Sequence, residues 1–239
     1  MARVLVIIPA YNEQETIAGV IRALREHTPD YDIAVVDDGS RDNTAAVVRS
    51  FPEVVLIRLP YNLGIGGAMQ TGFKYAQRNG YEIAVQCDAD GQHPVEQIAA
   101  LVNRLEKGDA DLVIGSRYVA NSNYTPTFGR RIGKSILSRL VDAVIGGGIT
   151  DTTSGFRAIN RKTLDVFARH YPEDYPEAEA LVIVHKSGLR AVEIPVEMRP
   201  RQGGNSSIRP PHALYYMAKV GLAIFIDVFR KFTKTPGDD

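Results

Sequence analysis

Two carboxylates stand two residues apart in the segment Asp88-Ala89-Asp90-Gly91-Gln92-His93-Pro94. They follow Ile83–Gln86, a short apolar run that is typical of a buried strand. Carboxylates so placed repel each other unless a cation neutralises them, and oxygen ligands of this kind suit Mg²⁺ or Mn²⁺. The alternative is a solvated turn, for which Asp and Gly are favoured. The position directly after a buried strand favours the metal site.

A second acidic pair, Asp37-Asp38, follows the apolar residues Val35 and Val36 and precedes Gly39-Ser40. A carboxylate at the end of such a strand can accept hydrogen bonds from a ribose or a base. We therefore interpret Asp37 as a nucleotide ligand. Helix capping is the simpler interpretation for the polar residues that follow, Asp42 and Asn43.

Alternating elements are needed to bring these carboxylates together. Short apolar runs rich in β-branched residues predict strands covered on both faces. Helix-like stretches lie between them, and this rhythm predicts a mostly parallel sheet with right-handed crossovers, whose ligands bind at the carboxyl ends of the strands. The expected strands are Val4–Ile8, Ile33–Val36, Val54–Ile57, Ile83–Gln86 and Leu112–Ile114, and the expected helices are Glu13–Glu26, Asn43–Arg49, Gly66–Arg78 and Val95–Glu106.

The second half of the chain is less regular. A polar loop is expected from Thr150 to Arg157 and a Gly-, Arg- and Pro-rich loop from Arg199 to Pro211. We predict an α/β domain over residues 1–211, followed by an amphipathic helix and tail over residues 212–239 that either belongs to the same domain or lies at a membrane interface. The remaining expected elements are helices at Arg131–Ile145, Lys162–His170, Glu177–Lys186 and His212–Phe232, and a strand at Ala191–Met198.

Composition narrows the class of protein further. Lys plus Arg and Asp plus Glu both number 28 in 239 residues, so the net charge is zero and a general nucleic-acid partner is not indicated. Cys87 is the only cysteine, which excludes an internal disulfide and suits a reducing compartment. The apolar run after Met1 is too short for a signal peptide, and we interpret it as the first strand.

Six motifs occur in an order that resembles glycosyltransferase family 2, and within it the dolichyl- or polyprenyl-phosphate sugar synthases. The resemblance covers residues 4 to 208 and implies a GT-A fold and inversion at the anomeric carbon. The motifs are Pro9-Ala10-Tyr11-Asn12-Glu13, Val36-Asp37-Asp38-Gly39-Ser40, Asn62-Leu63-Gly64, Asp88-Ala89-Asp90-Gly91-Gln92-His93-Pro94, Gly115-Ser116-Arg117-Tyr118 and Ser154-Gly155-Phe156-Arg157.

The resemblance also implies roles for particular residues on the donor side. The metal site would consist of Asp88, Asp90 and Gln92, with Asp90 the most certain ligand and Asp88 also close to the nucleotide. The nucleotide pocket would be lined by Pro9, Tyr11, Glu13 and Asp37.

On the acceptor side, Arg117, Arg131 and Ser135 resemble a grip for the acceptor phosphate. Glu179 falls where the family often carries an acid, and Glu177 is its near alternative. The loop Arg199–Ser207 resembles the segment that closes over the diphosphate. Its cations, Arg201 among them, would stabilise the charge of the leaving group; the candidates from this region are Arg199, Arg201 and Arg209.

Three other features receive structural interpretations. The run Asn62-Leu63-Gly64-Ile65-Gly66-Gly67 is expected to be a tight turn where the backbone nears the ligand, and not a phosphate cradle. We expect His93 to be a structural neighbour of the metal ligands, and Cys87 to be an inert core residue.

The terminal helix His212–Phe232 is apolar but is interrupted by Lys219 and Asp227, so a transmembrane span is not expected. It is either an interfacial helix or a helix packed on the core. The expected location is therefore the cytoplasmic face of a membrane, as a peripheral protein. By analogy with related synthases, a small integral membrane protein is a further possible partner.

These observations predict transfer of a hexose or N-acetylhexosamine from a UDP- or GDP-sugar to a polyprenyl phosphate. A phosphate acceptor is already anionic and hardly needs a general base, whereas a hydroxyl acceptor would need one. Two alternatives stay open: transfer to a saccharide hydroxyl in polysaccharide assembly, and a non-catalytic subunit that binds nucleotide sugars. The sequence leaves the donor base, the sugar and the oligomeric state undetermined.

Overall fold

The computed structural model describes residues 2–119, 141–173 and 176–199. Four predicted site residues, Arg131, Ser135, Arg201 and Arg209, lie outside these ranges. So do the predicted terminal helix, the loop from residue 200 onward and the first part of the helix expected at Arg131–Ile145.

One seven-stranded sheet organises the described residues, in the order β3-β2-β1-β4-β6-β5-β7. All pairings are parallel except those of β6, which runs antiparallel to both β4 and β5. The predicted class, a mostly parallel α/β sheet, is confirmed. The strands are β1 (Val4–Ala10), β2 (Asp32–Asp37), β3 (Val55–Arg58), β4 (Ile83–Gln86), β5 (Leu112–Ser116), β6 (Arg157–Asn160) and β7 (Ala191–Pro195).

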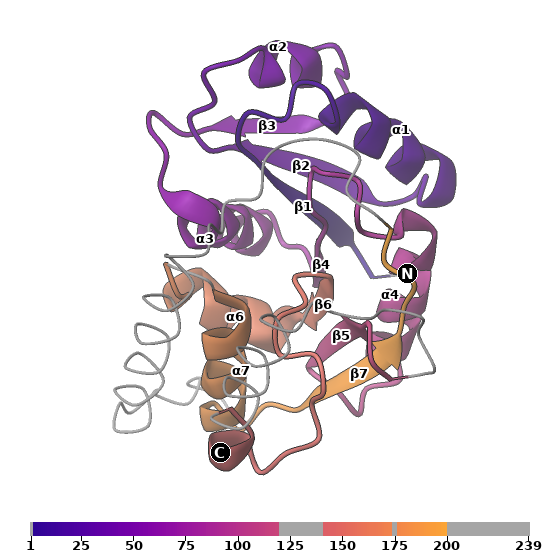
Figure 1. Cartoon of the computed structure of the whole chain (residues 1–239), viewed down its shortest axis with the longest axis vertical. Coiled ribbons are helices and arrows are strands. Elements are labelled where there is room, and N and C mark those ends of the chain that lie inside the picture. Colours follow the sequence, from indigo (N-terminus) through magenta and orange to yellow (C-terminus); the bar gives the residue numbers. More distant parts are fainter. Residues whose placement is uncertain (1, 120–140, 174–175, 200–239) are drawn as a thin grey trace, which may run out of the picture.

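Helices cover both faces of the sheet (Figure 1), so its strands are buried on two sides. In β1, Leu5 and Ile7 pack toward α3, α6 and α7, whereas Val6 and Ile8 pack toward α1, α2 and α4. This period of two explains why β1 reads as a continuous apolar run. The helices are α1 (Ile17–His27), α2 (Thr44–Arg49), α3 (Gly64–Arg78), the 3₁₀ turn η1 (Val95–Gln97), α4 (Ile98–Glu106), α6 (Arg161–Arg169) and α7 (Pro176–Lys186).

The register places the functional loops along one edge of the sheet. Ala10 pairs with Asp37, so β1 and β2 end side by side. Because β6 runs against its neighbours, its first residue, Arg157, pairs with Gln86 at the end of β4 and with Ile114 near the end of β5. The carboxyl ends of the parallel strands and the start of β6 therefore meet at the edge where ligands bind in such sheets.

The start of α3 packs against the loop after α6 without space for a side chain. A Cβ on Gly66 would lie 2.0 Å from the carbonyl oxygen of Pro172 and 2.2 Å from that of Glu173. These are backbone atoms, so the neighbours cannot rotate away. We expect Gly66→Ala to lower the free energy of unfolding by about 1–3 kcal/mol, the usual cost of overpacking, as measured by denaturant titration.

Gly19 in α1 provides the matched control. A Cβ there meets nothing within 4 Å, and Ala is preferred to Gly in a helix by roughly 0.5–1 kcal/mol. Gly19→Ala should therefore be neutral or stabilising. Equal effects of the two substitutions would contradict the close approach at Gly66.

Candidate active site

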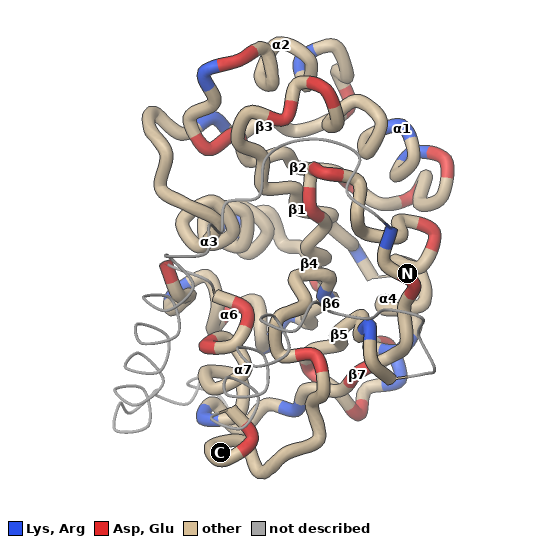
Figure 2. Tube along the Cα trace, in the orientation of Figure 1, with Lys and Arg blue, Asp and Glu red and all other residues tan. Residues whose placement is uncertain are grey.

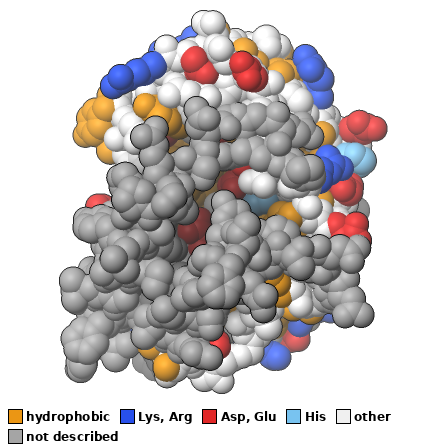
Figure 3. Space-filling view, viewed as in Figure 1, with side chains coloured by type: hydrophobic (Ala, Val, Ile, Leu, Met, Phe, Trp, Pro, Cys, Tyr) orange, Lys and Arg blue, Asp and Glu red, His pale blue; other side chains and the backbone are white. Residues whose placement is uncertain are grey.

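Acidic residues lie on the loop that follows β4, at the carboxyl end of that strand (Figure 2). In the space-filling view, acidic side chains and a His side chain are visible on this face (Figure 3). Loops after β1, β2, β4 and β5 and the loop before β6 surround this part of the sheet.

The loops after β1 and β2 are held together by hydrogen bonds from backbone to side chain. The N–H of Asn12 donates to Ser40 Oγ (3.0 Å), and the N–H of Arg41 donates to Asn12 Oδ1 (2.9 Å). The N–H of Glu13 donates to Thr44 Oγ1 (2.8 Å). Asn12 has a φ of 57°, a left-handed conformation that Asn tolerates better than most residues. These contacts fix the predicted nucleotide pocket as one unit.

Asp37 occupies the predicted place at the end of β2, but its carboxylate is not free. It is completely buried and accepts from the N–H of Ser40 (3.0 Å) and from Arg58 Nε (3.1 Å). Of the other predicted pocket residues, Pro9 is buried within β1 and Tyr11 is exposed. Asp37 can therefore shape the pocket through Ser40 and Arg58 in addition to any direct ligand contact.

The sequence predicted no role for Asp38. In the structure its carboxylate binds the backbone at the N-terminus of α3. Its two oxygens accept from the N–H groups of Leu63 (2.7 Å) and Gly64 (2.9 Å) at the start of α3. A negative charge is favourable at a helix N-terminus. Burial raises the pKa of Asp38, whereas these two hydrogen bonds lower it.

Asp38 also binds the backbone of the Gly-rich run at residues 62–67. The N–H groups of Leu63 and Gly64 are bound by Asp38, and that of Gly66 donates to the carbonyl oxygen of Glu173 (3.2 Å). One tight backbone approach in this run is made to Pro172 and Glu173 of the chain itself; an approach to a ligand stays a prediction.

Asp42 binds the backbone at the N-terminus of α2, as predicted. Its Oδ1 accepts from the N–H of Thr44 (2.9 Å) at the start of α2, and its Oδ2 accepts from the N–H of Gln14 (3.2 Å). The same side chain thus caps a helix and connects two loops. Asn43, the other predicted cap, makes no capping hydrogen bond with its side chain.

His93 holds the first carboxylate of the acidic loop. Its Nδ1 accepts from the N–H of Asp88 (2.9 Å), so the ring proton belongs on Nε2, which lies 3.5 Å from Asp88 Oδ2. The imidazole is buried against the ring of Phe156, with 4.9 Å between centroids. His93 is therefore a structural neighbour of the predicted metal ligands, as the sequence indicated.

The acidic loop fits a divalent cation. Asp88 Oδ1 is buried and has no hydrogen-bond partner among the described residues, and Asp90 is buried with its Oδ1 accepting from the N–H of Gln92 (3.0 Å). Within the described ranges, no three His, Cys, Asp or Glu residues form a metal-binding group. Two carboxylates and the amide oxygen of Gln92 would leave coordination positions for phosphate and water, as Mg²⁺ prefers.

The segment after β7 runs beside this loop. The N–H of Arg199 donates to the carbonyl oxygen of Gln92 (2.9 Å), and its guanidinium pairs with Glu96 (2.8 Å). The chain therefore passes the acidic loop at Arg199, immediately before the predicted closing loop.

Arg117 follows β5 and is bound by the loop that precedes β6. Its Nε and Nη2 donate to the two carboxylate oxygens of Asp151 (2.8 and 2.7 Å), and Nη2 also donates to Thr153 Oγ1 (2.8 Å). Asp151 is completely buried and was not predicted as a site residue.

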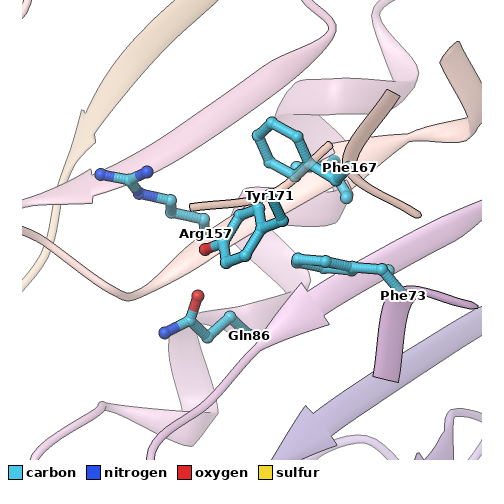
Figure 4. Close-up of a pocket in the computed structure, with 7 residues that line it drawn as sticks. Phe73, Gln86, Arg157, Phe167 and Tyr171 are labelled. Carbon is cyan, nitrogen blue, oxygen red and sulfur yellow. The ribbon is translucent and has the colours of Figure 1, made fainter. Parts of the chain in front are cut away.

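The positively charged side chain of Arg157, the first residue of β6, is buried inside the protein. It donates from Nε to the carbonyl oxygen of Ser154 (2.7 Å) and from Nη2 to that of Glu177 (2.8 Å), while Nη1 is buried and has no partner in the part of the chain that the structure describes. Its aliphatic part borders a small pocket on the α3 and α6 side, with Gln86 and Tyr171 (Figure 4). Burial lowers the pKa of Arg157, although nearby acids, Glu177 among them, oppose that shift.

Glu177 and Glu179 lie in the first turn of α7. Burial raises the pKa of Glu177, and the positive charge of Arg157 lowers it. The backbone carbonyl of Glu177 accepts from Arg157 Nη2, which joins the start of α7 to the first residue of β6.

The sequence profile described as glycosyl transferase family 2 matches residues 5–167. The chain belongs to this family. The family prediction made from the six motifs is confirmed.

Known family 2 glycosyltransferases match this chain over most of their length. It is 33% identical over 213 residues to the UDP-N-acetylglucosamine–dolichyl-phosphate N-acetylglucosaminyltransferase of Methanococcus voltae, covering 81% of this chain and 84% of that protein. It is 31% identical over 230 residues to the polyprenol monophosphomannose synthase of Mycolicibacterium smegmatis (91% and 85%). It is 35% identical over 217 residues to the undecaprenyl-phosphate mannosyltransferase of Micrococcus luteus (86% and 87%).

A solved structure supports the fold. Glucosyl-3-phosphoglycerate synthase from Mycobacterium tuberculosis, in complex with Mn²⁺, UDP and phosphoglyceric acid, superposes with a TM-score of 0.73 at 20% identity, covering all of this chain and 84% of that one. In the parts of this family 2 glycosyltransferase that the structure describes, no helix is both long and apolar enough to span a membrane.

Cys87 is buried, and burial raises its pKa well above the ordinary value, which agrees with an inert thiol.

Proposed function

We propose that this protein transfers a hexose or N-acetylhexosamine from a UDP- or GDP-sugar to a polyprenyl phosphate, with inversion at the anomeric carbon. The observation that carries the proposal is the match to three relatives whose names all refer to a polyprenyl carrier, at 31–35% identity and over more than four fifths of every chain compared. The acidic loop after β4 and Arg117 after β5 follow strands whose carboxyl ends lie at the same end of the sheet, which supports the proposal.

On the donor side, Asp88, Asp90 and Gln92 would hold Mg²⁺ or Mn²⁺, which when bound supplies positive charge to the leaving diphosphate. His93 fixes the backbone and carboxylate of Asp88. Of the cations that follow β7, Arg199 makes the backbone contact with Gln92, and the predicted Arg201 comes two residues later in sequence; both would add to that charge.

On the acceptor side, Arg117 with the predicted partners Arg131 and Ser135 would bind the acceptor phosphate. Arg suits a phosphate because its planar guanidinium can donate two parallel hydrogen bonds. An anionic phosphate oxygen attacks without a general base, so Glu179 and Glu177 would orient the acceptor or the sugar and need not remove a proton.

Asp37 provides a prediction for the nucleotide pocket formed with Pro9, Tyr11 and Glu13. Asp37→Ala should weaken nucleoside diphosphate binding by roughly 1–3 kcal/mol, because a charge-assisted hydrogen bond is lost and the groups that it held are released. Calorimetry with UDP and GDP in the presence of Mn²⁺ measures the change.

Arg58→Gln separates the two routes by which Asp37 could act. If Asp37 binds the nucleotide directly, Arg58→Gln should have a much smaller effect than Asp37→Ala; if it acts through Arg58, the two should be similar. Unchanged affinity in Asp37→Ala would remove this residue from the nucleotide pocket.

A carrier lipid implies that the protein works at a membrane surface. We therefore keep the proposal of a peripheral protein at the cytoplasmic face, with the terminal helix as its contact and a small integral membrane protein as a further possible partner. Binding to anionic vesicles with and without residues 212–239 tests it, and circular dichroism of the shortened chain shows whether that helix is needed for folding.

The function itself is tested by donor turnover. Purified protein is incubated with UDP- and GDP-sugars and Mn²⁺, with undecaprenyl phosphate in detergent, with free oligosaccharides, or with neither. Transfer to the lipid phosphate alone is expected. Transfer to oligosaccharides alone would favour polysaccharide assembly, and nucleotide-sugar binding without any transfer would favour a non-catalytic subunit.

A further inference from the structure

The side chain of Arg117, which we propose to bind the acceptor phosphate, is held in place by hydrogen bonds. Two nitrogens of its guanidinium meet both oxygens of Asp151 at 2.8 and 2.7 Å, and its own backbone N–H donates to Asp151 Oδ2 at 3.0 Å. Thr153 Oγ1 accepts a further hydrogen bond from Nη2. Main chain and side chain of Arg117 are therefore fixed by the same short loop.

Asp151 is in turn held by the edge strand of the sheet, β7. The carboxylate of Glu193, on β7, accepts from the N–H groups of Thr150 (2.8 Å) and Asp151 (2.6 Å) and from Thr150 Oγ1 (2.9 Å). Ser154 Oγ donates to the carbonyl oxygen of Gly115 on β5 (2.7 Å). The loop at residues 150–154 is thus attached to both β5 and β7, which pair side by side in the sheet.

The position of Asp151 determines how its partner must lie. Its side chain has no exposure to solvent, and a buried carboxylate is costly unless hydrogen bonds and a counter-charge compensate it. Arg117 supplies both through a planar fork whose geometry a Lys could not reproduce. The carboxylate therefore selects one orientation of the guanidinium plane.

We infer that Asp151 is a positioning residue for acceptor recognition: it orients Arg117 toward the acceptor phosphate, and the loop at residues 150–154 and Glu193 keep it in place. This inference rests on the proposed function, in which Arg117 binds that phosphate. Because Asp151 already balances the charge of Arg117, recognition at this point depends on the direction of the N–H groups more than on net charge.

Asp151→Asn tests the inference. The amide keeps the size of the side chain but replaces one acceptor oxygen with a donor that opposes the Arg117 fork. With donor saturating, kcat/KM for undecaprenyl phosphate should fall at least about 10-fold, since small misplacements of binding groups cost this much or more. Calorimetric affinity for the nucleoside diphosphate should stay within about 2-fold, as expected for a site with no shared partners.

The matched control is Asp109→Asn. Asp109 also forms a bidentate pair, with Arg104, but it lies before β5 at the opposite edge of the sheet. This variant should transfer sugar as the wild type does. If Asp151→Asn does not fold, Thr153→Val removes a second side-chain acceptor of Arg117 Nη2 from a half-buried position and should give a smaller loss of the same kind, confined to the acceptor.

A double-mutant cycle distinguishes positioning from a general structural role. Adding Asp151→Asn to Arg117→Ala should change kcat/KM for the acceptor by less than about 2-fold, because both substitutions remove the same interaction. Independent, multiplying losses would overturn the inference, as would an equal loss of donor affinity.

The Nε–H resonance of Arg117 provides a readout that does not depend on turnover. In the wild type and in Asp109→Asn, the Nε–H group is bound to a carboxylate, so its chemical shift should differ from those of exposed arginines. In Asp151→Asn its chemical shift should become similar to theirs. If the wild type ignores polyprenyl phosphate, the proposed function fails, but this spectrum still shows whether Asp151 positions Arg117. An unchanged Arg117 resonance in Asp151→Asn would refute the positioning role.

Discussion

Asp90→Asn is expected to lower the rate of sugar transfer at least about 100-fold, because a bound metal supplies several kcal/mol of charge stabilisation at such sites. The substitution is conservative in shape. Asp90 Oδ1 accepts from the N–H of Gln92, and an Asn oxygen can accept the same bond, so the turn should persist while the charge is lost. Addition of EDTA to the wild type should abolish turnover, and Mg²⁺ or Mn²⁺ should restore it.

Two measurements make this prediction specific. Asp30→Asn removes a carboxylate from an exposed position before β2, away from the acidic loop, and should leave the rate unchanged. Mn²⁺ binding in the presence of UDP or GDP should be weakened in Asp90→Asn and normal in Asp30→Asn. Full activity of a preparation shown to be free of metal would refute the assignment of Asp88, Asp90 and Gln92.

The first half of the fold could be predicted from the sequence because its strands are covered on both faces. β1 is apolar from Val4 to Ile8 and β4 matches its predicted bounds, since neither has a solvent face that would interrupt the run. The antiparallel strand β6 was missed although its first three residues are also buried. It has only four residues, begins with Arg157 and ends with Asn160, so no period of two or apolar run marks it.

The candidate site was predictable where residue type alone indicates chemistry. Asp88, Asp90 and Asp37 stand at strand ends, and the parallel sheet brings those ends to one edge. Asp38 and Asp151 could not be identified in this way, because their roles depend on partners 25 or more positions away. A signal existed for Asp38: an acid in the family motif next to the residue already chosen.

The pairing of Asp37 with Arg58 could not be predicted for a related reason. Arg58, which pairs with it, ends the neighbouring strand β3 and is adjacent only once the register of β2 and β3 is known. Strand order and register are long-range properties, and a single sequence gives them only through general rules of topology.

Arg157→Met should lower the free energy of unfolding by about 3–5 kcal/mol, the usual cost of removing one partner from a buried charged group. The guanidinium is completely buried and binds the carbonyl oxygens of Ser154 and Glu177 at 2.7 and 2.8 Å. Met has a similar volume but no donor, so both carbonyls would lose their partner. Glu177, whose pKa burial already raises, would also lose the positive charge that opposes this shift.

The competing effect is the cost of burying the guanidinium, which Arg157→Met removes. Replacement of a whole buried ion group by apolar residues is often neutral or stabilising, but here only the cation is removed and the acids and carbonyls around it remain. The loss should therefore prevail. Arg161→Met is the matched control, since Arg161 pairs with Asp165 at the surface and such pairs contribute roughly 0–1 kcal/mol. Denaturant titration of the two variants measures the difference, and an Arg157→Met protein as stable as Arg161→Met would show that the burial cost of the cation outweighs its contacts.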